Sequence, residues 1–338
     1  MVAPTSTLYW SISRCVNGNN VKIVVVGAGA MGGLFGARLA AAGNDVILHD
    51  TWQEHVQAIQ RDGLVITELD GTDVRYRLPA TTDVSPEAGS ADLLLVEVKA
   101  YDTFEALQPY DGVLGEQTVV LSLQNGLGNL EQIRAALPRH PRVALGTSAH
   151  GSMVLGPGRL HHAGKGPNVI GVPPRRQDDA EVDLTPVARA FNAAGFETEI
   201  AADVRTMIWR KLMANVAINA ISALTGALIG EIPQDADLLA IATAAVQEAT
   251  AVMAAEGVPG EDEDYVSYAQ HIMELTARNR ASMLQDILRG KRTEIDAING
   301  AVAWLAEQHG IAAPTNRMLA ALVRSRERAI RASIGERG

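Results

Sequence analysis

The sequence predicts two domains of different fold class, a doubly wound α/β domain followed by an all-α domain. Before residue 200, short β-branched and aliphatic runs alternate with helical stretches, which is typical of a parallel sheet with helices on both faces. After residue 200 the strand patterns stop and five helical stretches follow, several separated by Gly or Pro. A chain of 338 residues is long enough for two domains with separate cores.

The domain boundaries follow from this change of pattern. We expect a loose N-terminal extension over residues 1–20, the α/β domain over 21–200 and the all-α domain over 201–334. The first twenty residues have neither a basic start nor a sustained apolar stretch, so they do not resemble a secretory signal. After the first two strands, further strands are expected near residues 64–67, 91–100, 117–126, 142–151, 168–172 and 196–200.

A glycine-rich turn opens the α/β domain. Gly27, Gly29 and Gly32 form a G-x-G-x-x-G pattern directly after the strand predicted over 21–26 and at the start of a helix that stops at Gly43. The first glycine permits a tight turn, the second lets the backbone approach a pyrophosphate, and the third lets helix and strand pack closely. Unless this turn serves packing alone, it predicts a Rossmann-type domain that binds a dinucleotide through Gly27, Ala28, Gly29, Ala30, Met31 and Gly32.

Asp50 bears on the choice of dinucleotide. It ends the second predicted strand, about 20 residues beyond the glycines, where an acidic side chain binds the adenosine ribose and repels a 2′-phosphate. The nearest arginine downstream is Arg61. The local pattern therefore favours NADH, with the alternative that Asp50 only caps the next helix.

The composition limits which partners the protein is expected to bind and where in the cell it is expected to lie. The net charge of −10 disfavours binding to nucleic acid or to an anionic membrane surface. The most apolar run, residues 212–229, is interrupted by two Asn, so no transmembrane segment is expected. Cys15 is the only cysteine, which excludes an internal disulfide and fits a cytoplasmic protein. Apolar helical faces such as 238–255 serve either the core or a homodimer interface.

A polar stripe marks the first long helix of the all-α domain. Lys211, Asn215 and Asn219 are four residues apart, so they share one face of an otherwise apolar helix. One reading is structural, with the lysine turned outward and the amides linking neighbouring helices. The other is a substrate wall, because reduction of a carbonyl leaves an alkoxide that must be stabilised and protonated.

The segment 279–300 supplies candidate partners for this stripe. Ser282 and Asp286 fall on one helix face, and Gly290 ends that helix. Thr293 and Asp296 resemble a capping box that starts the next helix, which places Glu294 in its first turn. Glu294 either complements the helix dipole or serves as a carboxylate for Lys211 or a substrate hydroxyl.

Five motifs together resemble the ketopantoate reductase (2-dehydropantoate 2-reductase) family: "GAGAMG", "VEVKAYD", "LSLQNGLGN", "KLMANVAINAISALTG" and "SMLQDILRGKRTEIDAINGAV". The resemblance implies NADPH-dependent reduction of a 2-oxo acid, 2-dehydropantoate, to pantoate. It implies that Lys211 donates the proton and that Glu294 lies close to cofactor and substrate. It further implies substrate contacts from Asn125, Asn215, Asn219 and Ser282, and cofactor contacts from the glycine turn, Lys99, Asn125 and Ser152. On their residues alone, Lys99 could simply cap a strand end and Asn125 could simply form a turn.

The sequence departs from the family at one position. NADPH-dependent members usually carry an arginine just after the second strand, and this chain has Thr51 there, preceded by Asp50. NADP is thus implied by the resemblance and NAD by the local residues. His161 and His162, in a stretch similar to the family's hairpin, are expected to be structural, and no metal site is expected.

Two other functions remain open from the sequence. The β-hydroxyacid and opine dehydrogenases share the two-domain plan, but the former place lysine and asparagine three residues apart rather than four. A dinucleotide-sensing protein without catalysis would be expected to lack Lys211 or Glu294, and both are present.

Overall fold

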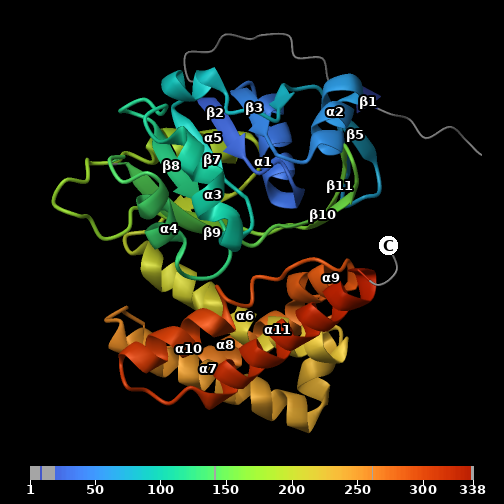
Figure 1. Ribbon diagram of the computed structural model, residues 1–338, viewed down its shortest axis with the longest axis vertical. Helices are drawn as coiled ribbons and strands as arrows, with labels where there is room; N and C mark the ends of the chain where they lie inside the picture. Colours follow the sequence, from blue (N-terminus) through green and yellow to red (C-terminus); the bar gives the residue numbers. More distant parts are fainter. Residues whose placement is uncertain (1–7, 10–19, 141, 261, 336–338) are drawn as a thin grey trace, which may run out of the picture. The chain divides into compact units, whose positions relative to one another are not determined.

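The computed structural model describes residues 8–9, 20–140, 142–260 and 262–335, which form two compact units. The α/β unit contains the chain up to Gln124 together with 129–204 (Figure 1). The helical unit contains the chain from Arg205 onward and also Asn125–Gly128, which leave the α/β unit for four residues. The expected extension over 1–20 lies outside the described residues, apart from a two-residue strand at 8–9 and Asn20.

The main sheet of the α/β unit confirms the doubly wound prediction. Its central strands are apolar and fully buried, as expected where helices cover both faces. The parallel arrangement fails at one pair, because β12 runs antiparallel to β9. The strand order is β13 (Thr198–Ile200), β12 (Asn168–Gly171), β9 (Val143–Ser148), β8 (Val119–Ser122), β7 (Leu93–Val96), β2 (Lys22–Val26), β3 (Asp45–His49) and β6 (Ala80–Thr81).

Aromatic side chains pack helices α1 and α5 against this sheet. Phe35 of α1 contacts Phe191 of α5 with ring centroids 5.6 Å apart, and Phe196 lies 4.9 Å from Phe35. These rings fill the space between helix and sheet. The helices are α1 (Ala30–Ala41), α2 (Gln53–Asp62), α3 (Thr103–Leu107), α4 (Asn129–Ala136) and α5 (Thr185–Ala193), with 3₁₀ turns η1 (Pro86–Ser90), η2 (Ala100–Asp102) and η3 (Gln108–Tyr110).

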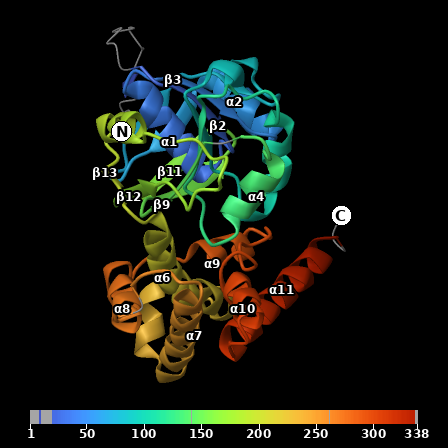
Figure 2. The ribbon, with the colours of Figure 1, turned by 90° about the vertical axis from the view of Figure 1, so that its left-hand side faces the viewer.

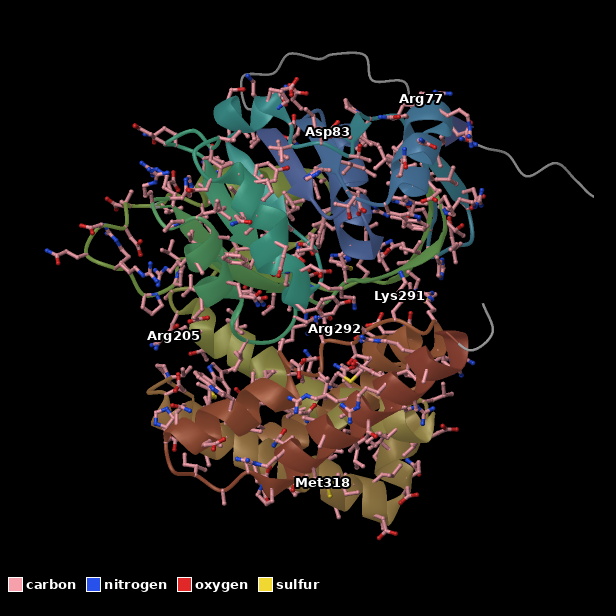
Figure 3. The ribbon with its side chains drawn as sticks, in the orientation of Figure 1. Arg77, Asp83, Arg205, Lys291, Arg292 and Met318 are labelled. Atoms are coloured by element: carbon pink, nitrogen blue, oxygen red, sulfur yellow. The ribbon has the colours of Figure 1, made fainter. Side chains whose placement is uncertain are left out.

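A second, five-stranded sheet was not expected from the sequence. Its order is β1 (Leu8–Tyr9), β5 (Asp73–Tyr76), β4 (Leu64–Thr67), β11 (Arg159–Gly164) and β10 (Gly151–Gly156). Its strand β5 is half-buried at every position and has the polar sequence DVRY, so it carries no apolar run that would reveal it. Arg77 and Asp83, labelled in Figure 3, lie on either side of β6, along the stretch that leaves β5.

A partly buried polar cluster that includes His162 holds this second sheet to α1. His162 Nδ1 lies 3.1 Å from Glu68 Oε2, and Tyr76 donates to the other Glu68 oxygen at 3.1 Å. Arg38 of α1 forms an ion pair with the same carboxylate. His161 Nδ1 lies 3.1 Å from the Thr67 carbonyl oxygen. These contacts agree with the structural role expected for both histidines.

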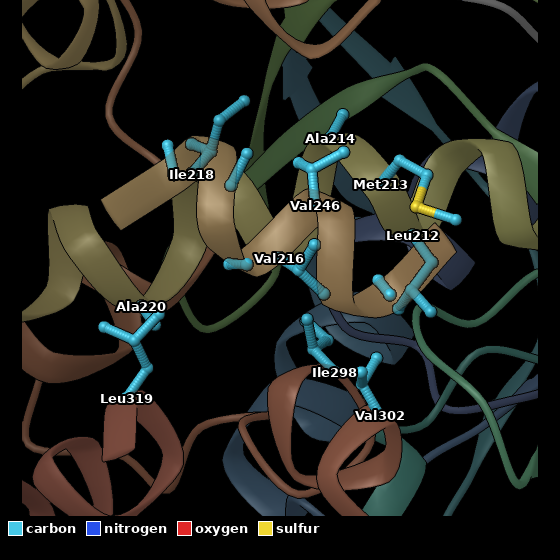
Figure 4. Close-up of a cluster of buried hydrophobic side chains, with 14 of the residues drawn as sticks. Leu212, Met213, Ala214, Val216, Ile218, Ala220, Val246, Ile298, Val302 and Leu319 are labelled. Atoms are coloured by element: carbon cyan, nitrogen blue, oxygen red, sulfur yellow. The ribbon is translucent and has the colours of Figure 1, made fainter. Parts of the chain in front are cut away.

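The helical unit packs around α6 (Val204–Thr225), seen beside α7, α8 and α10 in Figure 2. Leu212, Val216 and Ala220 are buried among side chains of the neighbouring helices (Figure 4). The other elements are η4 (Ile229–Gln234), α7 (Ala236–Ala255), α8 (Tyr265–Leu275), α9 (Ser282–Leu288), α10 (Asn299–Gln308) and α11 (Pro314–Gly335).

One helix among the described residues, α7, is long and apolar enough to cross a membrane by length and composition. Its buried residues repeat every three or four positions, at Ala242, Ala245, Val246, Ala249 and Val252. This stripe belongs to the core cluster of the helical unit. The composition of α7 is therefore also that of a helix packed in a protein core.

Buried asparagines connect three helices of this unit. Asn299 of α10 donates to Asn316 Oδ1 at 2.9 Å, and Asn316 of α11 donates to Glu248 of α7 at 2.8 Å. Glu248 also accepts from the backbone N–H groups of Thr315 and Asn316, each at 2.9 Å. A carboxylate from one helix thus satisfies the first N–H groups of another.

His150 makes the stability of the α/β unit depend on pH. Burial, together with the nearby His162, Arg38 and Lys165, lowers its pKa from 6.5 to about 4. The folded state therefore keeps the ring neutral while the unfolded chain takes up a proton. We expect the free energy of unfolding to fall as pH drops from about 6.5 to 4, with a His150 share of up to about 3 kcal/mol.

Urea unfolding of wild type and His150→Leu at pH 7.5 and pH 5 measures this share. Leu keeps the ring's apolar neighbours Phe35 and Phe196 in contact with an apolar side chain. The variant should lose less stability between the two pH values than wild type. Equal losses in the two proteins would contradict the assignment.

Candidate active site

The glycine turn has the geometry that a dinucleotide needs. Gly27 has a φ of +95°, and a Cβ there would lie 2.6 Å from Val98 N. A Cβ on Gly32 would lie 1.9 Å from the Gly27 carbonyl oxygen, so only glycine fits where α1 meets the sheet. At Gly29 a Cβ would meet nothing within 4 Å, which leaves that stretch of backbone open to a ligand. Gly29 also precedes α1, whose first N–H groups and dipole suit a phosphate.

Asp50 is half-buried and accepts a hydrogen bond from Trp52 N at 2.9 Å. Trp52 is the residue just before α2, so Asp50 shapes the start of that helix without capping its N–H groups directly. Thr51 is exposed, and Arg61 pairs with the adjacent Asp62 at 2.7 Å. The acidic group therefore stands at the end of β3 as the sequence predicted, beside an exposed threonine.

The loops that follow β7 and β8 are tied together by Gln124. Its Nε2 donates to the Val98 carbonyl oxygen at 2.6 Å and to Thr103 Oγ1 at 2.8 Å. Lys99 lies in the first of these loops and is half-buried. The sequence analysis missed Gln124, although a glutamine between a buried strand and an Asn-Gly turn is a visible signal. Its hydrogen bonds hold the Lys99 loop in place.

Ser152 is half-buried in β10. Its Oγ is buried and has no hydrogen-bond partner among the described residues. A buried hydroxyl of this kind is suited to a ligand atom or a water molecule.

The polar stripe lies on one 22-residue helix, α6. Lys211 and Asn215 are half-buried, and Asn219 is 5% exposed. Asn215 Nδ2 is buried without a partner among the described residues. A buried amide donor left in this way is expected where a ligand supplies the acceptor.

Asn219 and Ser282 come together from distant parts of the chain. Ser282 is the exposed first residue of α9, and its Oγ donates to Asn219 Oδ1 at 3.5 Å. The pair joins two residues that the sequence analysis assigned to the substrate. Asp286, on the same short helix as Ser282, is buried.

Glu294 is buried, and Asn125 Nδ2 donates to its Oε2 at 3.4 Å. The predicted capping box is wrong, because α10 begins only at Asn299 and Glu294 lies in a turn before it. Thr293 Oγ1 instead accepts from Ile295 N at 3.2 Å, a local hydrogen bond that closes this turn. Glu294 is therefore not in the first turn of a helix, which removes the helix-dipole reading.

Basic side chains lead into that turn. Lys291 and Arg292, labelled in Figure 3, are exposed on the stretch between α9 and Glu294. Arg292 forms an exposed ion pair with Asp296 at 3.5 Å. The described residues contain no group of three or more His, Cys, Asp or Glu able to hold a metal ion.

Comparison with known proteins assigns first the class and then the family. A nicotinamide-dependent oxidoreductase is the class that the glycine turn and the relatives define. The sequence matches "Ketopantoate reductase PanE/ApbA" over residues 23–175 and "Ketopantoate reductase PanE/ApbA C terminal" over 203–327. The chain belongs to the ketopantoate reductase family, as the motif resemblance predicted.

Individual relatives cover nearly the whole chain. A 2-dehydropantoate 2-reductase from Halobacterium salinarum is 38% identical over 315 residues, covering 91% of this chain and 99% of that protein. A PanE/ApbA family ketopantoate reductase structure from Ralstonia eutropha JMP134 is 35% identical with a TM-score of 0.82, covering 92% and 99% of the two chains. A D-mandelate dehydrogenase structure with NADH and anilino(oxo)acetate is 28% identical with a TM-score of 0.85, also covering 92% and 99%. These relatives favour a reductase over the sensing-protein and opine dehydrogenase alternatives.

Gly126 allows Asn125 to reach Glu294. Its φ is +81°, and a Cβ there would lie 2.4 Å from the Ala297 carbonyl oxygen, which also accepts from Leu127 N at 2.8 Å. Gly126→Ala should push the loop off the 294–297 turn. We expect kcat/KM to fall at least about tenfold and the free energy of unfolding to fall by about 3 kcal/mol.

Gly128→Ala is the matched control in the same loop. Its φ of +87° is equally strained for alanine, but a Cβ there meets nothing within 4 Å. Urea unfolding and steady-state rates should show the larger loss in Gly126→Ala. If both variants behave alike, backbone strain and not the contact with Ala297 accounts for the effect.

Proposed function

We propose that the chain reduces 2-dehydropantoate to pantoate with a nicotinamide dinucleotide, using the polar face of α6 as its substrate wall. The observation that carries this proposal is the hydrogen bond between Ser282 and Asn219, one helical turn from Asn215, whose Nδ2 has no partner among the described residues. A 2-oxo acid presents a carboxylate, a keto oxygen and, in this substrate, a hydroxyl. Amide and hydroxyl groups on one face match those atoms with hydrogen bonds.

The dinucleotide, when bound, supplies the hydride that reaches the keto carbon. Lys211 then donates its proton to the keto oxygen as that oxygen gains negative charge. Lys211 lies one helical turn before Asn215 on the polar face of α6. The proton donor therefore comes first along the helix, and the substrate-binding amides follow it. Asn215 Nδ2 offers its N–H to a substrate oxygen.

Glu294 has a supporting role in this proposal. One carboxylate oxygen accepts from Asn125, and the group can accept a second hydrogen bond from the substrate hydroxyl. The buried position of Glu294 makes such a bond stronger than it would be in water. Asn125 thereby orients the carboxylate, while Lys99 and Ser152 belong to the cofactor side.

NADH is the cofactor that we propose for this chain. Support comes from Asp50 at the end of β3 and from the exposed Thr51 where an arginine would hold a 2′-phosphate. The similar D-mandelate dehydrogenase structure contains NADH. Family resemblance alone would favour NADPH. Homodimer formation, a cytoplasmic location, and the absence of nucleic-acid and membrane partners stay predictions.

Removing the proton donor tests the mechanism. Lys211→Ala should lower kcat with 2-dehydropantoate by at least about 100-fold, the usual scale for a lost general acid. The dissociation constant of the dinucleotide, measured by nicotinamide fluorescence, should change by less than about threefold, a difference of under 1 kcal/mol. Lys22→Ala, at an exposed lysine in β2, serves as the control and should keep wild-type rates. Turnover of Lys211→Ala within a few-fold of wild type would remove Lys211 from the mechanism.

The charge of Asp50 is expected to select the cofactor. A carboxylate and a 2′-phosphate about 5 Å apart in water repel by about 1–2 kcal/mol, which is about tenfold in affinity. Asp50→Asn should raise kcat/KM for NADPH by about tenfold and change the value for NADH little. Asp45→Asn, at the exposed opposite end of β3, is the control. An unchanged NADPH to NADH ratio in Asp50→Asn would contradict the selection by charge.

A further inference from the structure

His55 of α2 bonds to two separate loops of the α/β unit. The side chain is 0% exposed. Its Nδ1 accepts from the backbone N–H of Gly158 at 3.0 Å, and its Nε2 lies 3.0 Å from the Ala28 carbonyl oxygen. Because Nδ1 accepts, the ring hydrogen lies on Nε2 and is donated to Ala28. The ring is therefore neutral, and burial lowers its pKa.

Each of the two bonded groups lies in a turn. Ala28 stands between the first two glycines of the dinucleotide turn. Gly158 stands in the turn between β10 and β11, and its carbonyl oxygen accepts from Val65 N at 2.9 Å. His55 thus connects the glycine turn to the second sheet. The second sheet therefore helps to hold the glycine turn in place.

Trp52 covers the ring of His55. The two rings are stacked, with centroids 4.9 Å apart and planes 8° apart. Trp52 N is in turn held by Asp50 at 2.9 Å. A chain of contacts therefore runs from the end of β3, through Trp52 and His55, to the glycine turn.

The bond to Ala28 fixes one peptide plane. In a trans peptide the carbonyl oxygen and the following N–H point in opposite directions, so the Gly29 N–H points away from His55. A peptide bond next to glycine flips readily, because glycine accepts both signs of φ. The bond from Nε2 opposes that flip on the stretch of backbone that is open to a ligand.

We propose that His55 is a positioning residue for the dinucleotide, holding the Ala28–Gly29 peptide so that the Gly29 N–H is presented to the pyrophosphate. This rests on the proposed function, since it needs a bound dinucleotide. His55 acts on the affinity for the cofactor and not on the proton or hydride steps. Its bond to Gly158 holds the ring in place, and its bond to Ala28 holds the turn.

Two substitutions separate these bonds. The Oδ1 of asparagine lies where Nδ1 lies in histidine, and the Nε2 of glutamine lies where Nε2 lies. His55→Gln keeps a donor for Ala28, and His55→Asn keeps only an acceptor for Gly158. We expect His55→Asn to raise the dissociation constant of NADH at least about tenfold and His55→Gln to raise it less than about threefold. In both variants kcat at saturating cofactor should stay within about twofold of wild type.

His140→Gln is the control, because that half-buried ring also bonds a backbone carbonyl, Thr118 O at 2.7 Å, away from the glycine turn. Its NADH affinity should match wild type. Equal affinity losses in His55→Asn and His55→Gln, or no loss in either, would overturn the positioning role. Wild-type protein that binds neither NADH nor NADPH would overturn the proposed function itself.

A measurement on wild type does not depend on how the variants fold. The imidazole ¹⁵N shifts of His55 at pH 7 should show a hydrogen on Nε2 and none on Nδ1, and this pattern should persist when NADH binds. A ring protonated on Nδ1, in either the free or the bound protein, contradicts the two bonds on which the proposal depends.

Discussion

The helical unit depends on one constraint: α6 is packed on most of its surface and yet carries polar side chains along one face. Buried amide groups are stable only when something accepts or donates to them. Asn219 finds Ser282, whereas the donor atom of Asn215 has no partner among the described residues. A helix chosen for packing alone would carry leucine or alanine at these positions. The polar face thus lies on the same helix that supplies the core through Leu212, Val216 and Ala220.

Much of the fold was predictable because its signals are local. The glycine turn follows from spacing, and each glycine has its own steric reason, from the positive φ of Gly27 to the contact of Gly32 with the turn itself. The second sheet was missed because its strand β5 is half-buried and polar, and its partners lie up to about 90 residues apart in the chain. The strand β12 was predicted, but its antiparallel direction was not, because a short buried run looks the same in either direction.

The arrangement of the candidate residues could be predicted where they lie at helical spacing, and not where the conformation of a loop sets their positions. Spacing of four put Lys211, Asn215 and Asn219 on one face, and α6 has them there. The position of Glu294 was misjudged, because Thr293 and Asp296 satisfy a capping pattern that the chain uses for a turn instead. Gln124 and His55 act through hydrogen bonds to backbone atoms remote in sequence, and no spacing rule reveals such partners.

Glu248 makes the packing of α7 depend on a helix that comes later in the chain, α11. Glu248 lies in the middle of α7, and its acceptors are filled by the first turn of α11, some 67 residues further along the chain. Because α11 follows α7 in the chain, α7 is synthesised before the backbone N–H groups that donate to Glu248. A chain without α11 would therefore leave the half-buried Glu248 without these donors and would uncover the face of α7 that α11 packs against.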